Sequence, residues 1–229
     1  MRVAILQSNY IPWKGYFDII GSVDAFVLYD DMQYTKNDWR NRNKIKTQNG
    51  LQWLSIPVRQ ENLHQKINET KITDAKWNIN HYRTISQSYA KAPQFKAQKE
   101  WLEALYMSAT SEYISEINRH FIDAINEKMD IKTKIYDSRE FVLAEGKSER
   151  LLALCQELGA TTYLSGPAAR DYLDESIFKD AGIGVEWMSY SGYQEYHQLF
   201  PPFEHGVSVI DLILNEGDNA KYFLKSGKQ

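Results

Sequence analysis

The chain has 229 residues, a formal net charge of -3 and a pI near 6.0, and this length suits one α/β domain. The weakly acidic balance excludes a global attraction to nucleic acid or to an anionic membrane and leaves only local anion sites. Cys155 is the single cysteine, which excludes disulfides within the chain and cysteine metal clusters. No apolar run approaches the roughly 18 residues of a membrane span, and no signal peptide is recognisable. We expect one domain over residues 1–229, located in the cytoplasm.

The first thirty residues predict a βαβ unit. Residues 3–6 and 25–29 are apolar runs typical of buried strands, and residues 16–23 can form a short helix between them. The right-handed crossover rule makes the two strands parallel. Polar and aromatic residues follow both strands, at the carboxyl ends where open parallel sheets bind their ligands. We therefore expect a binding site there.

The next segment predicts a β-hairpin. Residues 43–47 and 52–56 flank Asn49-Gly50, which is a strong signal for a tight turn between antiparallel strands. Pro57 would end the second strand or place it at an edge.

Residues 73–130 predict a helical insertion or lid. Trp77, His81, Ile85 and Tyr89 recur at four-residue steps, and Pro93 interrupts the pattern. Two further amphipathic segments follow before residue 130.

Strands and helices alternate again after the insertion. We expect strands at residues 134–136, 161–164 and 185–188, a helix from Ser148 as its cap to residue 158, and a last helix capped by Ser208. This order predicts a Rossmann-like α/β fold with a parallel sheet.

Carboxylates follow the second strand directly. At this position Asp30 and Asp31 can act as a base, orient an amine or sugar hydroxyl, or hold a metal. The alternative is that either aspartate caps a turn.

Two histidines are further candidates for acid–base chemistry. His81 shares a helical stripe with Trp77, which suits a structural histidine unless that stripe faces the site. His205 follows Glu204 in a proline-rich segment, as a base with its orienting carboxylate or as part of a surface turn. The catalytic candidates are Asp30, His81 and His205. No metal site is expected, because neither His197 nor His205 has zinc-ligand spacing.

Binding residues are expected after the first two strands and in two further clusters. Residues 36–44 interleave cations, amides and an indole, which can hold phosphate and stack on a base or sugar, unless they form a solvated loop. The Ser165-Gly166-Pro167 turn offers backbone N–H groups to a phosphate or an oxyanion. The substrate-binding candidates are Gln7, Asn9, Tyr10, Trp13, Tyr16, Asp31, Gln33, Trp39, Asn41, Arg42, Lys44, Ser165, Gly166 and Tyr172.

Several motifs resemble those of a known family over nearly the whole chain. They are Val3-Ala4-Ile5-x-Gln7-x-Asn9-Tyr10-x-Pro12-Trp13-x-Gly15-Tyr16-Phe17, Asp24-x-Phe26-Val27-x-Tyr29-Asp30-Asp31-x-Gln33-Tyr34, Asn41-Arg42-Asn43-Lys44-Ile45-Lys46, Trp53-Leu54-x-Ile56-Pro57-Val58, Tyr163-Leu164-Ser165-Gly166 and Ser208-x-Ile210-Asp211-Leu212. These motifs resemble the WbqC-like family. The resemblance implies a role in bacterial O-antigen or other surface polysaccharide synthesis, in which an amino-acid or acyl group, such as glycine, is attached to an amino sugar.

The opening unit is also similar in layout to the H-x-G-H region of nucleotidyltransferases and pantothenate-synthetase-like ligases, proteins of the HUP type. Trp13 and Tyr16 stand where that motif has histidines, and no K-M-S-K-S-like segment is present. Adenylyl transfer is therefore disfavoured, while the similarity of fold is kept.

We expect an acyl or aminoacyl transferase that modifies the amine of a nucleotide-linked or lipid-linked amino sugar. Its co-substrate would be an activated acyl donor, such as a carrier-protein thioester, a CoA thioester or an acyl-adenylate, with no bound cofactor. The alternatives are an ATP-dependent ligase or nucleotidyltransferase and a non-catalytic nucleotide-sugar-binding protein.

Overall fold

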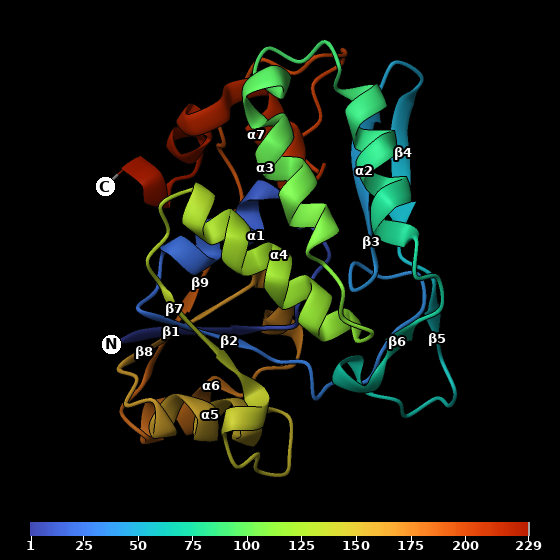
Figure 1. The fold of residues 1–229 in the computed structure, drawn as a ribbon. Coiled ribbons are helices and arrows are strands. Elements are labelled where there is room, and N and C mark those ends of the chain that lie inside the picture. Colours follow the sequence, from blue (N-terminus) through green and yellow to red (C-terminus); the bar gives the residue numbers. More distant parts are fainter. Residues whose placement is uncertain (229) are drawn as a thin grey trace.

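A parallel sheet forms the centre of the computed structural model, which describes residues 1–228. Its strands are β1 (Arg2–Leu6), β2 (Ala25–Leu28), β7 (Lys134–Asp137), β8 (Thr162–Ser165) and β9 (Gly184–Trp187). All neighbouring pairs are parallel in the order β7-β2-β1-β8-β9 (Figure 1). From β1 the chain first adds β2 and β7 on one side, and then adds β8 and β9 on the other side of β1. The predicted α/β fold with a parallel sheet is confirmed, and its switch point lies between β1 and β8.

Alternating side chains of the strands enter two separate cores. Ala4 and Phe26 face one core, whereas Val3 and Val27 face the other, because successive strand residues point to opposite faces. Helices α1 (Lys14–Gly21), α4 (Ile114–Lys128) and α7 (Val209–Glu216) contribute to the first core, and α5 (Ser148–Glu157) and α6 (Glu175–Asp180) to the second. Figure 1 shows α5 and α6 below the sheet and the other helices above it.

The predicted hairpin is present as β3 (Arg42–Thr47) and β4 (Gly50–Ser55), which pair antiparallel. Gly50 has a φ of 100°, a conformation that side chains with a Cβ rarely adopt, and it closes the turn. A second antiparallel pair joins β5 (Val58–Arg59) to β6 (Lys71–Ile72). Together these pairs place an antiparallel layer beside the sheet.

The three helices predicted between residues 73 and 130 are α2 (Trp77–Ser88), α3 (Phe95–Met107) and α4. They do not form a lid. Phe121 and Ile122 of α4 are fully buried in the first core, as are Ile85 of α2 and Leu102 of α3. The reason is that α4 is the crossover helix between the parallel strands β2 and β7, so its apolar stripe must cover the sheet.

Two expected helix starts have different outcomes. Ser208 caps α7, since its hydroxyl accepts a hydrogen bond from the Ile210 N–H at 3.2 Å. Ser148 does not cap α5, because Lys147 occupies the cap position. The Ser148 hydroxyl instead accepts the N–H of Asp174 at 3.0 Å and so joins α5 to the start of α6.

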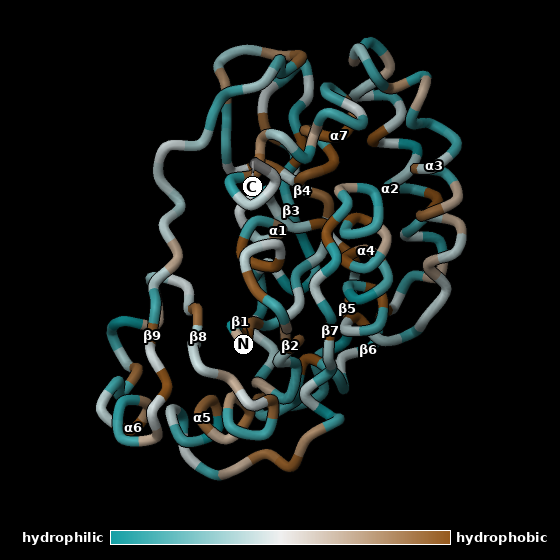
Figure 2. Tube along the Cα trace, turned by 90° about the vertical axis from the view of Figure 1, so that its left-hand side faces the viewer, coloured by the Kyte–Doolittle hydropathy of each residue, from teal (hydrophilic) through white to brown (hydrophobic). Residues whose placement is uncertain are grey.

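Residues 188–207 connect β9 to α7 without a helix or strand. Figure 2 shows this segment running from the end of β9 to the end of the molecule near α7. It is held on α1 and α7, because the hydroxyl of Tyr193 donates to Asp18 and that of Tyr196 donates to Asp211. The segment therefore packs on helices of the first core.

Candidate functional site

A cavity of about 690 Å³ lies at the switch point, between the carboxyl ends of β1 and β8 and the start of α5. We refer to it as the switch-point cavity. Its polar lining consists of Gln7, Tyr29, Lys147, Arg150, Tyr163, Ser165 and Tyr172, and Gly146, Gly166 and apolar residues complete the wall. Of the expected binding residues, it brings together Gln7, Ser165, Gly166 and Tyr172. Its position is the one at which open parallel sheets bind ligands.

The charged side chains of the cavity are cations. Lys147 and Arg150 lie one turn apart at the start of α5, where backbone N–H groups add partial positive charge. Arg150 is oriented by a hydrogen bond from its Nε to the carbonyl of Ala144 at 2.8 Å. Among the described residues that line the cavity there is no Asp, Glu or His. The cavity therefore suits an anionic group such as a phosphate.

Tyr29 and Tyr172 supply rings and hydroxyl groups beside these cations. Burial raises the pKa of Tyr29, and the neighbouring Arg150 guanidinium offsets part of that rise. Burial also raises the pKa of Tyr172. Both hydroxyl groups are therefore neutral donors at pH 7, and a planar or sugar ring can pack against either aromatic face.

The floor of the cavity is fixed by Asp30 and Arg40. The N–H of Ser8 donates to Asp30 Oδ1 at 2.7 Å, and Arg40 Nη1 donates to the Ser8 carbonyl at 3.1 Å. Tyr16 donates its hydroxyl hydrogen to the carbonyl of Gln7 at 2.9 Å, and Asn9 accepts from Arg40.

Asp30 acts on the cavity through this loop. Its side chain is almost fully buried, and burial raises its pKa to about 6. Because it lies behind the loop and is not part of the cavity lining, Asp30 is a positioning residue in this structure.

Asp31 and Gln33 hold the segment that follows β2. The Ser138 hydroxyl and Lys66 Nζ donate to Asp31 at 2.8 and 3.1 Å. Burial alone would raise the pKa of Asp31, but these hydrogen bonds outweigh it and the pKa is lowered. Gln33 donates to the carbonyl of Leu63. Both side chains are engaged in contacts within the protein, away from the cavity lining.

His81 and Tyr10 lie together inside the first core. The Tyr10 hydroxyl contacts His81 Nδ1 at 2.8 Å and the Tyr106 hydroxyl at 2.8 Å, and His81 Nε2 contacts the Ser55 carbonyl at 3.2 Å. Burial lowers the pKa of His81 to about 4. Since both ring nitrogens already have partners and neither residue lines the cavity, we assign both a structural role.

His205 and Trp13 pack at the segment of residues 188–207. The His205 ring lies 4.6 Å from the ring of Phe203, and the Trp13 ring lies 5.2 Å from that of Tyr190. Burial and the nearby Lys14 ammonium lower the pKa of His205. None of these described residues belongs to the lining of the switch-point cavity. The contacts of His205 are with Phe203, whereas those of His81 are with Tyr10 and Ser55.

A second group of expected binding residues meets on the hairpin. Trp39 and Trp53 have ring centroids 5.4 Å apart, and Arg42 and Lys44 lie over the Trp53 ring. We call these four residues the tryptophan platform. Asn41 lies beneath it, where its side chain donates to the Ile56 carbonyl at 2.8 Å and accepts from the Tyr34 hydroxyl at 3.0 Å. Asn41 therefore fixes the base of the hairpin.

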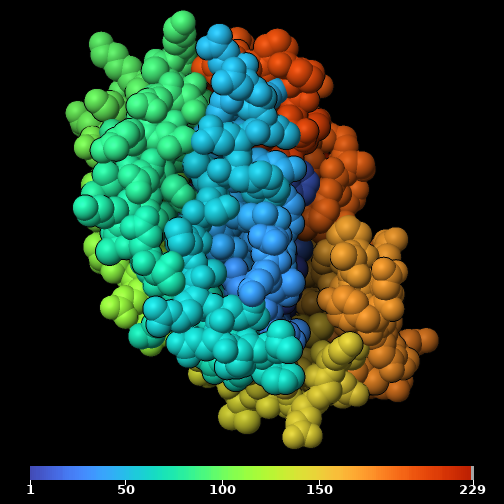
Figure 3. Space-filling model, turned by 90° about the vertical axis from the view of Figure 1, so that its right-hand side faces the viewer, coloured from blue at the N-terminus to red at the C-terminus, as the bar shows by residue number. Residues whose placement is uncertain are grey.

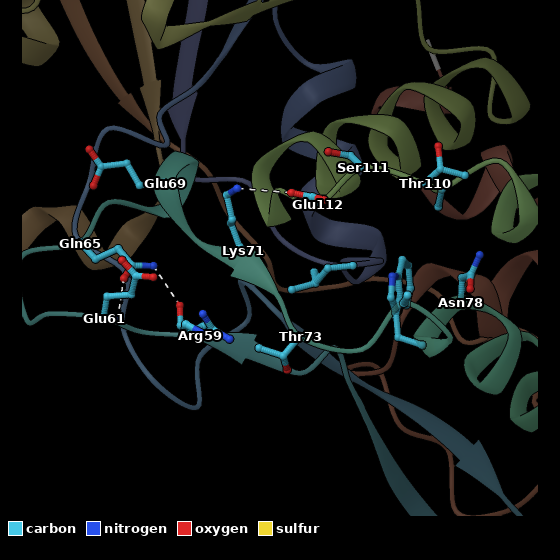
Figure 4. Close-up of a pocket in the computed structure, with 14 residues that line it drawn as sticks. Arg59, Glu61, Gln65, Glu69, Lys71, Thr73, Asn78, Thr110, Ser111 and Glu112 are labelled. Atoms are coloured by element: carbon cyan, nitrogen blue, oxygen red, sulfur yellow. Dashed lines mark hydrogen bonds and ion pairs between the residues drawn. The ribbon is translucent and has the colours of Figure 1, made fainter.

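Another cavity, of about 520 Å³, lies beside β5, β6 and the start of α2 (Figure 4). Its polar groups mostly pair with one another or with the backbone: Lys71 Nζ lies 3.3 Å from Glu112 Oε2, and Gln65 Nε2 donates to the Arg59 carbonyl at 3.0 Å. None of the described residues lining it comes from the parallel sheet. We therefore take the switch-point cavity as the candidate site.

Sequence reasoning missed Tyr29, Lys147, Arg150 and Tyr163 of the cavity and Trp53 of the platform. A signal was present in Gly146-Lys147-Ser148-x-Arg150 at a helix start. Gly146 has a φ of 90°, a conformation that favours glycine, and it turns the chain into α5. A glycine followed by two cations one turn apart indicates an anion site once the helix start is known.

Neither a metal-ligand cluster nor a membrane-spanning helix is found among the described residues. Within residues 1–228, no group of three or more His, Cys, Asp or Glu side chains is placed to hold a metal ion. Over the same part of the chain, no helix has the length and apolarity needed to cross a bilayer.

Comparison with known proteins gives two matches. A model of the WbqC-like protein family matches residues 7–222, a range that includes the polar lining of the cavity and the tryptophan platform. The chain is also 47% identical over 229 residues to an uncharacterized protein of Mycobacterium tuberculosis, Rv1507c, covering 100% of this chain and 99% of that relative. No solved structure matches the chain significantly.

Proposed function

Because the chain belongs to the WbqC-like protein family, we propose that it is an N-acyltransferase of bacterial surface polysaccharide synthesis, with a Rossmann-like fold of the HUP type. The acceptor is the amine of a nucleotide-linked or lipid-linked amino sugar, and the reaction takes place in the cytoplasm. The observation that carries the proposal is the cation pair in the switch-point cavity. Both kinds of acceptor have a phosphate next to the sugar, and Lys147 and Arg150 are suited to bind it.

In the proposed reaction, the sugar amine attacks the carbonyl carbon of an activated acyl donor. The C–N bond forms and the bond from the carbonyl carbon to the sulfur or phosphate oxygen of the leaving group breaks. The proton lost by the amine is taken up by the departing thiolate or, where the leaving group is a phosphate, by water. The oxyanion that forms would face the Ser165-Gly166 turn. An amine resembling an α-amino group is neutral in roughly a tenth of molecules at pH 7, so the reaction can start without a strong base in the cavity.

This pathway agrees with the absence of Asp, Glu and His among the described lining residues. It also changes the roles expected for Asp30, His81 and His205. Asp30 supports the floor, whereas His81 and His205 lie in other parts of the molecule.

One observation favours a second function, an ATP-dependent ligase or nucleotidyltransferase, because the same cations suit a triphosphate. Against it, Trp13 and Tyr16 stand in place of the histidine pair and make structural contacts with Tyr190 and Gln7. A non-catalytic nucleotide-sugar-binding protein is the third possibility, since the cavity alone accounts for binding.

The experiment supplies UDP-glucosamine with either acetyl-CoA and glycyl-thioester donors, or with ATP, Mg²⁺ and the free acid, and detects the products by mass spectrometry. The transferase predicts product from a thioester without ATP. Pyrophosphate release and product only in the ATP mixture would establish the ligase. Saturable binding of UDP-glucosamine without any product in either mixture would support the binding protein.

Arg150→Ala should weaken binding of UDP-glucosamine roughly 10- to 150-fold, since the loss of a charged hydrogen bond costs about 1.5–3 kcal/mol, and should reduce product formation accordingly. Arg83→Ala is the matched control, because Arg83 is an exposed arginine of α2 outside the cavity lining.

A further inference from the structure

The tryptophan platform is an exposed aromatic surface with its own positive charge. Trp39 and Trp53 are 39% and 40% exposed, although a large aromatic side chain usually gains stability from burial. Adjacent exposed rings flanked by charged groups are typical of a binding surface. Figure 3 shows this face, with the loop after β2 and the hairpin in blue beside the segments after β8 and β9 in orange.

The strand period builds the platform. Lys44 pairs with Trp53 across the hairpin, and Arg42 lies two residues before Lys44, so all three side chains leave the same face. Asn43 and Ile45 point to the other face, where they are buried. Because Arg42 and Lys44 alternate with the buried Asn43 and Ile45, both cations lie on the exposed face of the hairpin, beside the indoles.

The cations are arranged over the rings. Cζ of Arg42 lies 4.2 Å from the Trp53 ring centroid, and Nζ of Lys44 lies 5.0 Å from Trp53 and 5.9 Å from Trp39. Arg42 is further held by hydrogen bonds to Asn37. The Lys44 ammonium has no acidic partner among residues 1–228, so its charge is available to a ligand.

The platform is connected to the floor of the switch-point cavity. The Trp39 carbonyl accepts the N–H of Tyr10 at 3.0 Å, and the next residue, Arg40, holds the Ser8 carbonyl. Ser8 directly follows Gln7 of the cavity lining. The loop that carries Trp39 is therefore hydrogen-bonded to the loop that follows Gln7 of the cavity lining.

We propose that the tryptophan platform binds a sugar ring that carries a carboxylate or a phosphate, as the part of the acceptor beyond the reacting amino sugar. This inference rests on the proposed function for its choice of acceptor. The exposed parts of the two indoles can pack against the polarised C–H groups of a sugar ring, while Arg42 and Lys44, which lie over the Trp53 ring, hold the anion. The two ring centroids lie 5.4 Å apart with the rings inclined by 37°, so the rings contact each other and leave no slot between them that would sandwich a nucleobase.

The test follows the indole N–H signals of Trp39 and Trp53 by NMR during titration with trigalacturonate, glucose 1-phosphate, neutral maltotriose and UMP. Trp39→Phe and Trp53→Phe assign the two signals. We expect trigalacturonate or glucose 1-phosphate to shift both signals, with weaker binding at high salt. Trp53→Ala should weaken that binding about tenfold, by the usual size of a stacking contribution. Lys44→Gln should weaken it about threefold.

Tyr222→Ala is the matched control. Tyr222 is an exposed ring with the Lys221 ammonium 5.5 Å from its centroid, on a different part of the chain. Its loss should leave the titrations unchanged, and thermal denaturation should show that every variant remains folded. A response to trigalacturonate alone identifies the carboxylate as the group bound, and a response to glucose 1-phosphate alone identifies the phosphate.

The proposal is overturned if neither anionic sugar shifts the two signals, if maltotriose binds as well as they do, or if UMP alone shifts them. UDP-glucosamine titrated into wild type and Arg150→Ala separates this result from the fate of the proposed function. If UDP-glucosamine binds in an Arg150-dependent manner but no anionic sugar shifts the Trp39 and Trp53 signals, only the platform proposal fails. An anionic sugar on the platform without Arg150-dependent binding removes the cavity assignment instead.

Discussion

The two faces of the parallel sheet use polar side chains in opposite ways. On the face covered by α5 and α6, Lys147 and Arg150 point their charges into an open cavity. On the other face, Tyr10 and His81 lie in an aromatic core and bond to one another. A polar group inside a core must be satisfied by the protein itself, whereas a group lining a cavity keeps its hydrogen-bonding capacity for a ligand. The comparison predicts that changes on the first face alter binding and changes on the second alter stability.

The largest expected effect is on binding. Lys147→Ala combined with Arg150→Ala should weaken the binding of UDP-glucosamine by about 3–6 kcal/mol, since each lost charged hydrogen bond costs about 1.5–3 kcal/mol. Isothermal titration calorimetry measures this change. The free energy of unfolding in urea should remain close to that of wild type. Strong destabilisation with unchanged affinity would contradict the view that these two cations serve binding rather than stability.

His81 should make stability depend on pH. Its folded pKa of about 4 lies below the ordinary value of 6.5, so the unfolded chain takes up the proton first. The contribution of neutral His81 to the free energy of unfolding is therefore fully present above pH 6.5 and is lost as the pH falls toward 4. Relative to His81→Gln, wild type should lose up to about 3 kcal/mol of unfolding free energy over this range. Parallel urea curves at several pH values test it, and a constant difference would contradict the assignment of His81 as a buried neutral group.

Tyr10→Phe tests the same core without changing a charge. It removes the hydroxyl that contacts both His81 and Tyr106, leaving buried polar groups with fewer partners. We expect a loss of about 1–3 kcal/mol in the free energy of unfolding, with unchanged affinity for UDP-glucosamine. Tyr222→Phe, at an exposed tyrosine, is the control for removing a hydroxyl. Equal stabilities of the two variants would show that the buried contact contributes little.

The smallest effect is expected at the Lys66–Asp31 ion pair. Its Nζ–Oδ1 distance is 3.1 Å, but the Lys66 side chain is about half exposed. Lys66→Ala should therefore change the free energy of unfolding by only about 0–1 kcal/mol. Thermal denaturation at low and high salt measures it. A larger loss would mean that this segment supports the cavity more strongly than its exposure indicates.

Local signals predicted the elements well. Runs of apolar residues gave the strands that follow Arg2 and Asp24, and Asn49-Gly50 gave the hairpin, because these features depend on neighbours in the chain. The predicted strand ends also indicated Gln7, Ser165 and Gly166 as binding residues, and all three line the cavity. Strand ends can be located from sequence, and the ends of parallel strands share one edge of the sheet.

Sequence could not decide which polar residues would face a ligand. His81 and Lys147 both stand on helices, yet one lies in a core and the other at the start of α5 beside the cavity. The difference arises because α2 packs on the hairpin within the first core, whereas α5 begins next to the switch point. A residue's chemistry shows what it is able to do, and only its surroundings show whether it is free to do it.

The sequence by itself determined the five strands of the parallel sheet, the hairpin turn and the family, because each depends on residues close together or on motifs along the chain. It did not indicate β5, β6 or α6. Tertiary structure alone decided the switch point between β1 and β8 and the meeting of Gln7 with Arg150. Only the tertiary structure shows that His81 is buried in the core and that Trp39 and Trp53 are exposed beside Lys44. The physical reason is that burial and contact between distant residues follow from packing, which no local pattern specifies.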